Sequence, residues 1–325
     1  MRRFRRLQIA LGALWLLDGL LQLQPANLSA SFAGQVIDSA MAQPDWIQRM
    51  VLWTASVLSA HPLSAGVTIG VVQVALGTAI ICPKSRRIGL ACSVVWALGV
   101  WVLGEGLGNL ATGFAMLPSG APGPALLYGL AAVVLLPSCD AAPLPDEQAP
   151  SAAAFGALGG QGAAVAWSVL WFVAAMLQAV PVDTLGFKIS ANFQMVSLGE
   201  PGVMAALDRA EAGFAITHGP ELTAALLALE LTAAGGALLH GVWRERLLLG
   251  VLVVLPVLWI GGENMGGLLT GRAIDVGAMP VYGLIAVAVL PLRPATPASS
   301  LLAAIRSWGR SIAASHDHSS APSPS

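Results

Sequence analysis

One motif occurs twice in this chain and places a carboxylate between glycines, directly after a hydrophobic segment. The pattern Trp-x-x-Gly-Glu-x-x-Gly-x-x-x-Thr-Gly begins at Trp101 and again at Trp259, 158 residues later (259 − 101). Further matches follow at nearly the same spacing: Trp15 with Trp171, His61 with His218, and Tyr128 with Tyr282. The sequence therefore predicts a tandem duplication in which the structure, and any site, is built twice.

The composition favours a membrane protein. Hydrophobic residues make up 56% of the 325 residues and charged residues only 10%, whereas soluble domains carry about 25% charged residues. A helix needs roughly 20 apolar residues to cross a hydrocarbon core. Eight segments approach this length, the fourth and eighth being short: 7–24, 62–82, 87–105, 123–137, 162–180, 221–242, 247–262 and 279–292. We expect an all-α integral membrane protein of eight spans, with lipid around it and no nucleic acid as partner.

Four spans in each copy suggest a parallel repeat. An even number of spans lets both copies insert the same way up, and the interface between them is then the natural place for a shared site. The expected organisation is a first repeat, a linker rich in Pro and Ala, a second repeat, and an amphipathic helix with a disordered tail: 1–137, 138–161, 162–293 and 294–325.

Basic residues predict the orientation. Twelve of the sixteen Lys and Arg residues fall on one side of the eight-span arrangement, and such residues favour the cytoplasmic side. We therefore expect a multi-pass protein of the bacterial cytoplasmic membrane with both termini cytoplasmic. The long first loops of the copies, 26–60 and 182–217, lie outside. In the first of them, apolar residues at helical spacing, such as Trp46, Trp53 and Val57, predict amphipathic helices.

Unpaired polar residues fall at mid-depth of predicted spans, where a charge is costly. Asp18 lies in the first span and Glu230 in the sixth, while Gln73 holds the position of Glu230 in the first copy. One interpretation makes these three side chains a path for a proton, an ion or a substrate between the copies. The other pairs Asp18 with Gln22 one turn on, and makes Glu230 hydrogen-bonded packing between helices.

Glu105 and Glu263 differ from those residues because both copies keep them. They lie at or just below the outer membrane interface, within Gly-x-x-x-Gly spacing that allows close backbone approach. With Thr112 and Thr270 nearby, they could bind a cation or a polar headgroup. Alternatively, each glutamate accepts hydrogen bonds from amides of its own glycine-rich turn and stabilises its own copy. The motif follows a membrane span rather than a strand, so it is not a nucleotide fingerprint.

Signals for metals, cofactors and catalysis are weak. His61 and His218 precede the second and sixth spans and could ligate a metal or haem, or could bond to loop carbonyls. The cysteines show no paired spacing and are interpreted as small apolar residues: Cys82, Cys92 and Cys139. The sequence contains no Ser-His-Asp set and no phosphate loop, so nothing favours an enzyme, and the cofactor stays unknown with quinone and haem both open.

The first span resembles the DoxX/DoxD-like membrane family. It carries Arg6, Gly12 and then Gly19-Leu-Leu-Gln22, similar to that family's Arg, Gly and Gly-x-x-Lys pattern, with Gln22 at the lysine position. The topology of four spans with a long first outer loop is also similar. The resemblance implies association with quinone-linked or oxidative-stress redox systems. The repeated Trp-to-Gly motif itself looks closer to uncharacterised bacterial membrane proteins.

Three functions are compatible with these features. The first is a transporter or permeation protein with a polar site between the repeats, as Asp18, Gln73 and Glu230 suggest. The second is a redox-associated membrane subunit with the histidines and paired glutamates near a quinone or metal. The third is a scaffold whose outer loops bind another membrane protein.

Overall fold

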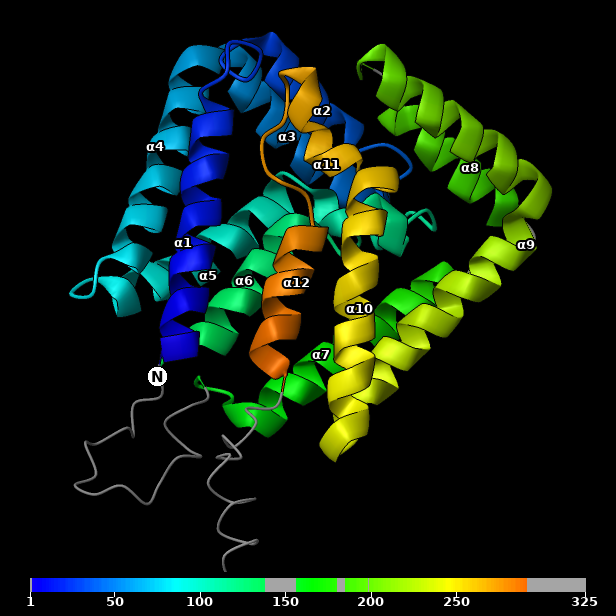
Figure 1. The fold of residues 1–325 in the computed structure, drawn as a ribbon. Coiled ribbons are helices and arrows are strands. Elements are labelled where there is room, and N and C mark those ends of the chain that lie inside the picture. Colours follow the sequence, from blue (N-terminus) through cyan, green and yellow to red (C-terminus); the bar gives the residue numbers. More distant parts are fainter. Residues whose placement is uncertain (1, 138–155, 180–184, 198, 291–325) are drawn as a thin grey trace, which may run out of the picture. The chain divides into compact units, whose positions relative to one another are not determined.

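The computed structural model describes residues 2–137, 156–179, 185–197 and 199–290, in which all regular secondary structure is helical (Figure 1). Residues 2–137 are called the first half below, and the described residues from 156 onward the second half. Most of the expected linker, the expected C-terminal helix and tail, and Cys139 lie outside the described residues.

Each of the eight predicted spans coincides with a helix. The first half contains α1 (Arg2–Gln22), α2 (Ala30–Asp38), α3 (Asp45–Ala60), α4 (Pro62–Ile81), α5 (Arg86–Leu103), η1 (Gly106–Asn109), η2 (Leu117–Ser119) and α6 (Pro124–Leu135). The second half contains α7 (Gly159–Gln178), α8 (Leu185–Val196), α9 (Gly202–Leu238), α10 (Gly241–Gly261), α11 (Asn264–Gly267), η4 (Leu268–Thr270) and α12 (Met279–Val289). The long runs of apolar residues therefore form helices as expected.

Fewer than eight of these helices could cross a membrane by length and composition alone. Among the described residues, four qualify, namely α4, α5, α7 and α9, and a fifth does if α10 and the short helices after it, bent by 54°, count as one span. Helix α1 is long enough but begins with four arginines. Helices α6 and α12 have only 12 and 11 residues, about 18 Å at 1.5 Å per residue.

Buried loops lead into both short helices. Residues 115–118 and 120–123 are buried before α6, and residues 276–278 are buried before α12. Non-helical backbone at membrane depth is tolerated where protein covers it. Each short helix therefore continues an extended, protein-covered segment, which explains how a helix below spanning length can occupy the interior of a membrane protein.

The two short helices pack against each other in the interior (Figure 1). Helix α12 also contacts α1, α7 and α10, and α6 contacts α1 and α5. One large apolar core runs through both halves. Within it the Trp15 and Tyr128 rings lie 4.6 Å apart and the Trp171 and Tyr282 rings 5.2 Å apart, measured between centroids. The aromatic residues of the sequence matches are thus mutual neighbours within each half.

Basic and amide side chains bind helix carboxyl ends at the end of the molecule that carries the N-terminus. Arg3 and Arg244 donate to the carbonyl oxygens of Leu290 and Val289 after α12, at 3.0 and 2.8 Å. Gln8 donates to Leu135 O at the end of α6, at 2.9 Å, and Arg5 donates to the last carbonyl of α4. Cations are favourable at these negative helix ends, so the three arginines stabilise the ends of α4 and α12, while Gln8 binds the end of α6.

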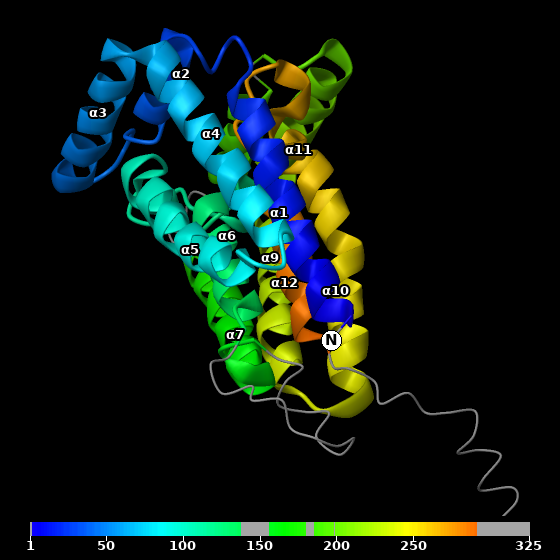
Figure 2. The same cartoon turned by 90° about the vertical axis from the view of Figure 1, so that its left-hand side faces the viewer.

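The outer helices form smaller clusters (Figure 2). Helices α2 and α3 bury one apolar face, whereas Trp46 and Trp53 on α3 stay 59% and 62% exposed. The predicted apolar stripe of α3 is therefore its outward face. In the second half, α8 packs on α9, which runs through a break at His218, two residues before Pro220.

Each half sends a loop into the other half's outer cluster. Ile274, before α12, packs with the apolar cluster of α2 and α3. Met116, before α6, packs with Ile189 and Ala215 of the α8–α9 cluster. The backbone carbonyl of Ala273 accepts a 2.9 Å bond from the buried Asn27. These contacts place second-half residues beside the first-half helices.

Candidate functional site

Both glycine–glutamate motifs form the same unusual turn. Four consecutive residues have positive φ angles of 54 to 62° in the first motif, 106–109, and of 47 to 68° in the second, 264–267. Two of the four are non-glycine in each case, and left-handed backbone costs such residues roughly 1 to 2 kcal/mol apiece. Backbone of this kind persists only where the surrounding structure holds it.

The glutamates help to stabilise this backbone by accepting hydrogen bonds from N–H groups at the start of the next helix. Glu105 Oε1 accepts from the Ala125 N–H at 2.9 Å. Glu263 accepts from the N–H groups of Ala278 and Met279, at 3.1 Å each. The hydrogen bonds therefore go to the first turns of α6 and α12 rather than to the glycine-rich turn itself, and they fix where each short helix begins.

The motif tryptophans and glycines bind the same loops. Trp101 Nε1 donates to Pro122 O and Trp259 Nε1 to Val276 O, each at 2.7 Å. A Cβ added to Gly108 would overlap the Pro122 carbonyl. The close backbone approach expected from this Gly-x-x-x-Gly spacing therefore occurs. It brings the glycine-rich turn against the loop that precedes the short helix.

The motif threonines close the turn. Thr112 Oγ1 donates to Asn109 O at 2.8 Å and accepts from the Phe114 N–H at 3.0 Å. Thr270 Oγ1 donates to Gly267 O at 2.7 Å and accepts from the Arg272 N–H at 3.0 Å. Neither threonine lines the cavity described next.

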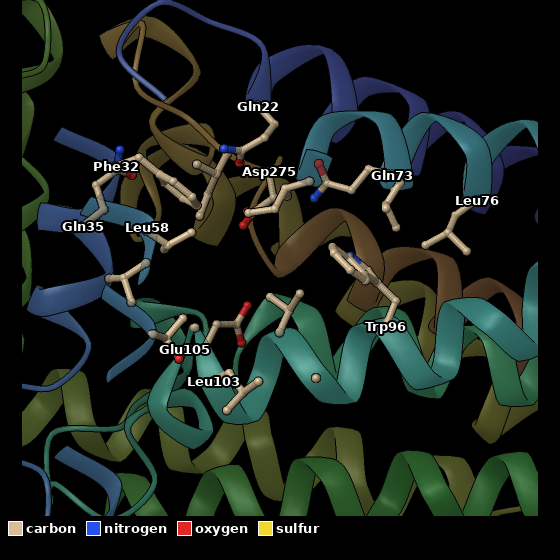
Figure 3. A pocket seen from close by; sticks show the side chains of 18 of the residues that line it. Gln22, Phe32, Gln35, Leu58, Gln73, Leu76, Trp96, Leu103, Glu105 and Asp275 are labelled. Carbon is tan, nitrogen blue, oxygen red and sulfur yellow. The ribbon is translucent and has the colours of Figure 1, made fainter. Parts of the chain in front are cut away.

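A cavity of about 690 Å³ is bordered by the first-half helices α1 to α5 and by the second-half loop before α12 (Figure 3). Most of its wall is apolar and includes Phe32, Leu58, Leu76, Val95, Trp96 and Val100. Val95 and Cys92 on α5 line it and are exposed. The cavity is therefore open along α5, a helix apolar enough to face lipid.

Polar side chains converge on this apolar space. Figure 3 shows Gln22, Gln73 and Asp275 on one side and Glu105 on the α5 side. Gln22 and Gln73 are only 1% and 8% exposed, yet Gln22 Nε2 and Gln73 Oε1 have no hydrogen-bond partner. Trp96 Nε1 and Glu105 Oε2 also lack one. Buried polar groups are normally hydrogen-bonded, so these four atoms are available to bind a polar group in the cavity.

Asp275 is the centre of the site's charge. It lies in the loop between η4 and α12, where its Oδ1 accepts from the Gly277 N–H at 2.7 Å. The negative charge of Asp275 acts on three other carboxyl groups, those of Asp18, Glu105 and Glu263. Burial raises the pKa of Asp275, and burial together with Asp275 raises the pKa of Glu105 to about 8. Both residues are half-buried, and both line the cavity.

Asp18 lies beside this site without lining it. Its side chain is 1% exposed, its Oδ1 has no partner, and the Tyr128 hydroxyl and the Val276 N–H face it. The Tyr128 oxygen likewise lacks a partner with hydrogen-bond geometry.

Glu230 belongs to a different cluster. It is fully buried, carries two unpartnered oxygens and interacts with the Lys188 ammonium. Lys188 also donates to Leu177 O at 3.0 Å, beside the buried Gln178. The structure thus brings Gln22, Gln73 and Glu105 to one cavity, while Glu230 lies in the second half with a lysine.

The histidines stay on the surface. His61 and His218 are exposed, and the His218 ring contacts Phe214 at 4.4 Å between centroids. Within the described residues, no group of three or more His, Cys, Asp or Glu side chains is arranged to hold a metal ion. Cys82 and Cys92 are free thiols.

Sequence reasoning did not identify Asp275, Trp96 or Lys188 as site residues. Asp275 lies in a predicted loop, four residues after the second motif, and Trp96 could be interpreted as packing. One sequence signal could have identified Asp275. When Tyr128 and Tyr282 are aligned, Asp275 matches Ala121, so the second copy carries an acid that the first copy lacks. Comparison with protein-family models, with curated proteins and with solved structures finds no match for this chain.

Proposed function

We propose that this chain is a membrane carrier or permeation protein that takes an amphipathic molecule from the bilayer into the cavity beside α5. The observation that supports this most is the convergence of Gln22, Gln73 and Asp275 on an otherwise apolar space. Small-molecule sites commonly combine an apolar wall with a few placed polar groups. A lipid-like body would fit the wall, and its polar end would satisfy the unpartnered amides.

The proposal includes eight spans in two parallel halves, with both termini cytoplasmic in a bacterial inner membrane. It is supported by the eight helices at the expected places and by the matching bonds of Trp101 and Trp259. The arginines at the N-terminal end support the orientation, since basic residues favour the cytoplasmic side. Reporter fusions at each loop, read out by activity on either side, test the topology.

A cavity-filling substitution tests the ligand proposal. Gly99 lines the cavity and has no atom within 4 Å of an added Cβ, so Gly99→Phe occupies the space. Gly250 on α10 is equally open but does not line the cavity, and Gly250→Phe is the matched control. Native mass spectrometry of gently purified protein should show a retained amphiphile with the wild type and the control, and none with Gly99→Phe. Equal retention by all three would contradict the proposal.

A redox-associated role is the second candidate, as the family resemblance implies. The observation that favours it is the pair of unpartnered N–H donors, Gln22 Nε2 and Trp96 Nε1, which could bind the carbonyl oxygens of a quinone in the same cavity. Absorbance and chromatography of an organic extract of the purified protein decide this. A quinone that is lost in Gln22→Leu and retained in the surface variant Asp38→Asn would support it.

A further inference from the structure

We infer that the ligand of this cavity is a lipophilic cation, and that its binding displaces a proton held by the carboxyl pair Glu105 and Asp275. The inference rests on the proposed function and names its substrate class. It is carried by the charge of the lining, by the aromatic wall, and by buried amides aimed into the space.

The charges in the lining are all of one sign. Glu105 and Asp275 are the acids, and no Lys, Arg or His is found among the described residues that line the cavity. An anionic headgroup would therefore meet two carboxyl groups and no compensating cation. A cation would meet its counter-charge in a space where Coulomb attraction is stronger than in water.

The wall suits a cation with an apolar body. Trp96 and Phe32 both line the cavity, and aromatic faces attract organic cations. A bare metal ion suits the cavity less, because its wall is largely apolar and no group of three or more His, Cys, Asp or Glu side chains among the described residues is arranged to hold one. Gln73 Oε1, which is buried without a partner, offers a further acceptor to a positive headgroup.

The surroundings of Asp275 explain the proton. The titratable groups that interact with it come from four elements, namely Asp18 on α1, Glu105 after α5, Tyr128 on α6 and Glu263 after α10. Burial raises the pKa of Asp275, and burial together with the charge of Asp275 raises the pKa of Glu105 to about 8, because carboxyl groups that share a buried site cannot all ionise. At pH 7 the Glu105 carboxyl group of the empty site therefore holds a proton.

Cation binding then proceeds as an exchange. The Glu105 carboxylic acid releases its proton to water, and the resulting carboxylate, beside Asp275, pairs with the incoming cation. No covalent bond to the ligand forms, and the charge of the site is the same before and after. An exchange of this kind couples movement of the cation to movement of a proton in the opposite direction.

Two probes of the same shape and opposite charge test the inference. Tetraphenylphosphonium and tetraphenylborate are titrated into purified full-length protein in detergent by calorimetry at pH 7, in two buffers of different ionisation enthalpy. Modification of Cys92, which lines the cavity, by a maleimide is followed in parallel. We expect the phosphonium to bind at least 10-fold more tightly than the borate, to protect Cys92, and to release about one proton per site.

Variants assign the effect to the carboxyl pair. Asp275→Asn should weaken phosphonium binding at least 10-fold, and Glu105→Gln should abolish the proton release. Asp38→Asn, at an exposed position on α2, should change neither. Equal binding of both probes with Cys92 protection by each would overturn the cation inference and leave an amphiphile site in place. If neither probe binds and Gly99→Phe has no effect on retained lipid, the proposed function fails as well.

Discussion

Tyr282 Oη donates a 2.9 Å hydrogen bond to the carbonyl oxygen of Ala121, which ties α12 to the loop that precedes α6. Both partners are buried, at 0% and 3% exposure. The bond joins the two halves. The loop before α12 also joins them, because it brings Ile274 and Asp275 to the first half. The position of the candidate site therefore depends on contacts that neither half makes alone.

Removal of the Tyr282 hydroxyl should weaken the joint between the halves. Tyr282→Phe leaves the Ala121 carbonyl without its partner, and we expect a loss of about 1 kcal/mol in the free energy of unfolding. Asp38→Asn, at an exposed position on α2, is the control. Thermal unfolding in detergent measures both, and an equal loss in the two variants would contradict the assignment.

Steric crowding, rather than backbone conformation alone, should make Gly108 essential. An alanine there would overlap the Pro122 carbonyl at a φ of 62°, whereas Gly113 has a φ of 76° and open space around it. We expect Gly113→Ala to cost about 1 kcal/mol from its left-handed backbone, and Gly108→Ala to abolish folded protein. Yield of monodisperse protein after detergent extraction reports the difference, and similar yields would argue against the crowding.

The helix-capping glutamates should differ in their contribution. Glu263 accepts two backbone N–H groups of α12, while Glu105 accepts one of α6. Loss of an N-terminal cap costs about 0.5 to 2 kcal/mol. We expect Glu263→Ala to lower the unfolding free energy more than Glu105→Ala, with the glutamine variants between wild type and alanine. Chemical unfolding in detergent gives the ranking, and a reversed order would contradict the assigned bonds.

Stability should fall as pH rises toward 8. The Glu105 pKa is about 8 in the folded protein, against an ordinary value of 4.5. The folded state therefore binds more protons than the unfolded state between these values, and the stabilisation present below pH 4.5 is lost as pH rises through this window. Glu105→Gln should flatten the dependence in part, because Asp275 shifts in the same direction. Melting temperatures from pH 5 to pH 8 test this, with Asp38→Asn as control, and an unchanged slope in Glu105→Gln would refute it.

Lys188 and Glu230 should behave as a coupled pair. The Lys188 ammonium attracts the buried Glu230 carboxylate, although both Glu230 oxygens lack a hydrogen-bond partner. We expect Lys188→Met to be destabilising and the double variant with Glu230→Gln to recover part of the loss. A double-mutant cycle in thermal unfolding measures the coupling, and simple additivity would show that the two side chains act independently.

Local sequence patterns predicted much of the chain. Apolar runs of sufficient length gave the eight helices, because burying apolar side chains and satisfying backbone hydrogen bonds both favour helices in a membrane. The repeated glycines marked turns that need positive φ angles, since glycine tolerates them most easily. For the glutamates of the same motif, the sequence left two alternatives open. One was binding of a ligand, and the other was a structural role as hydrogen-bond acceptors.

The tertiary structure alone decided which polar residues meet. Asp275 lies more than 250 residues after Gln22 (275 − 22 = 253), and the two share a cavity only because the loop before α12 packs into the first half. Glu230 and Gln73 occupy matched places in the sequence, yet Glu230 interacts with Lys188 and Gln73 faces the cavity. Periodicity and spacing report a chain's local preferences. The contacts between distant segments depend on how the side chains of both halves fill space together, and these contacts placed the site.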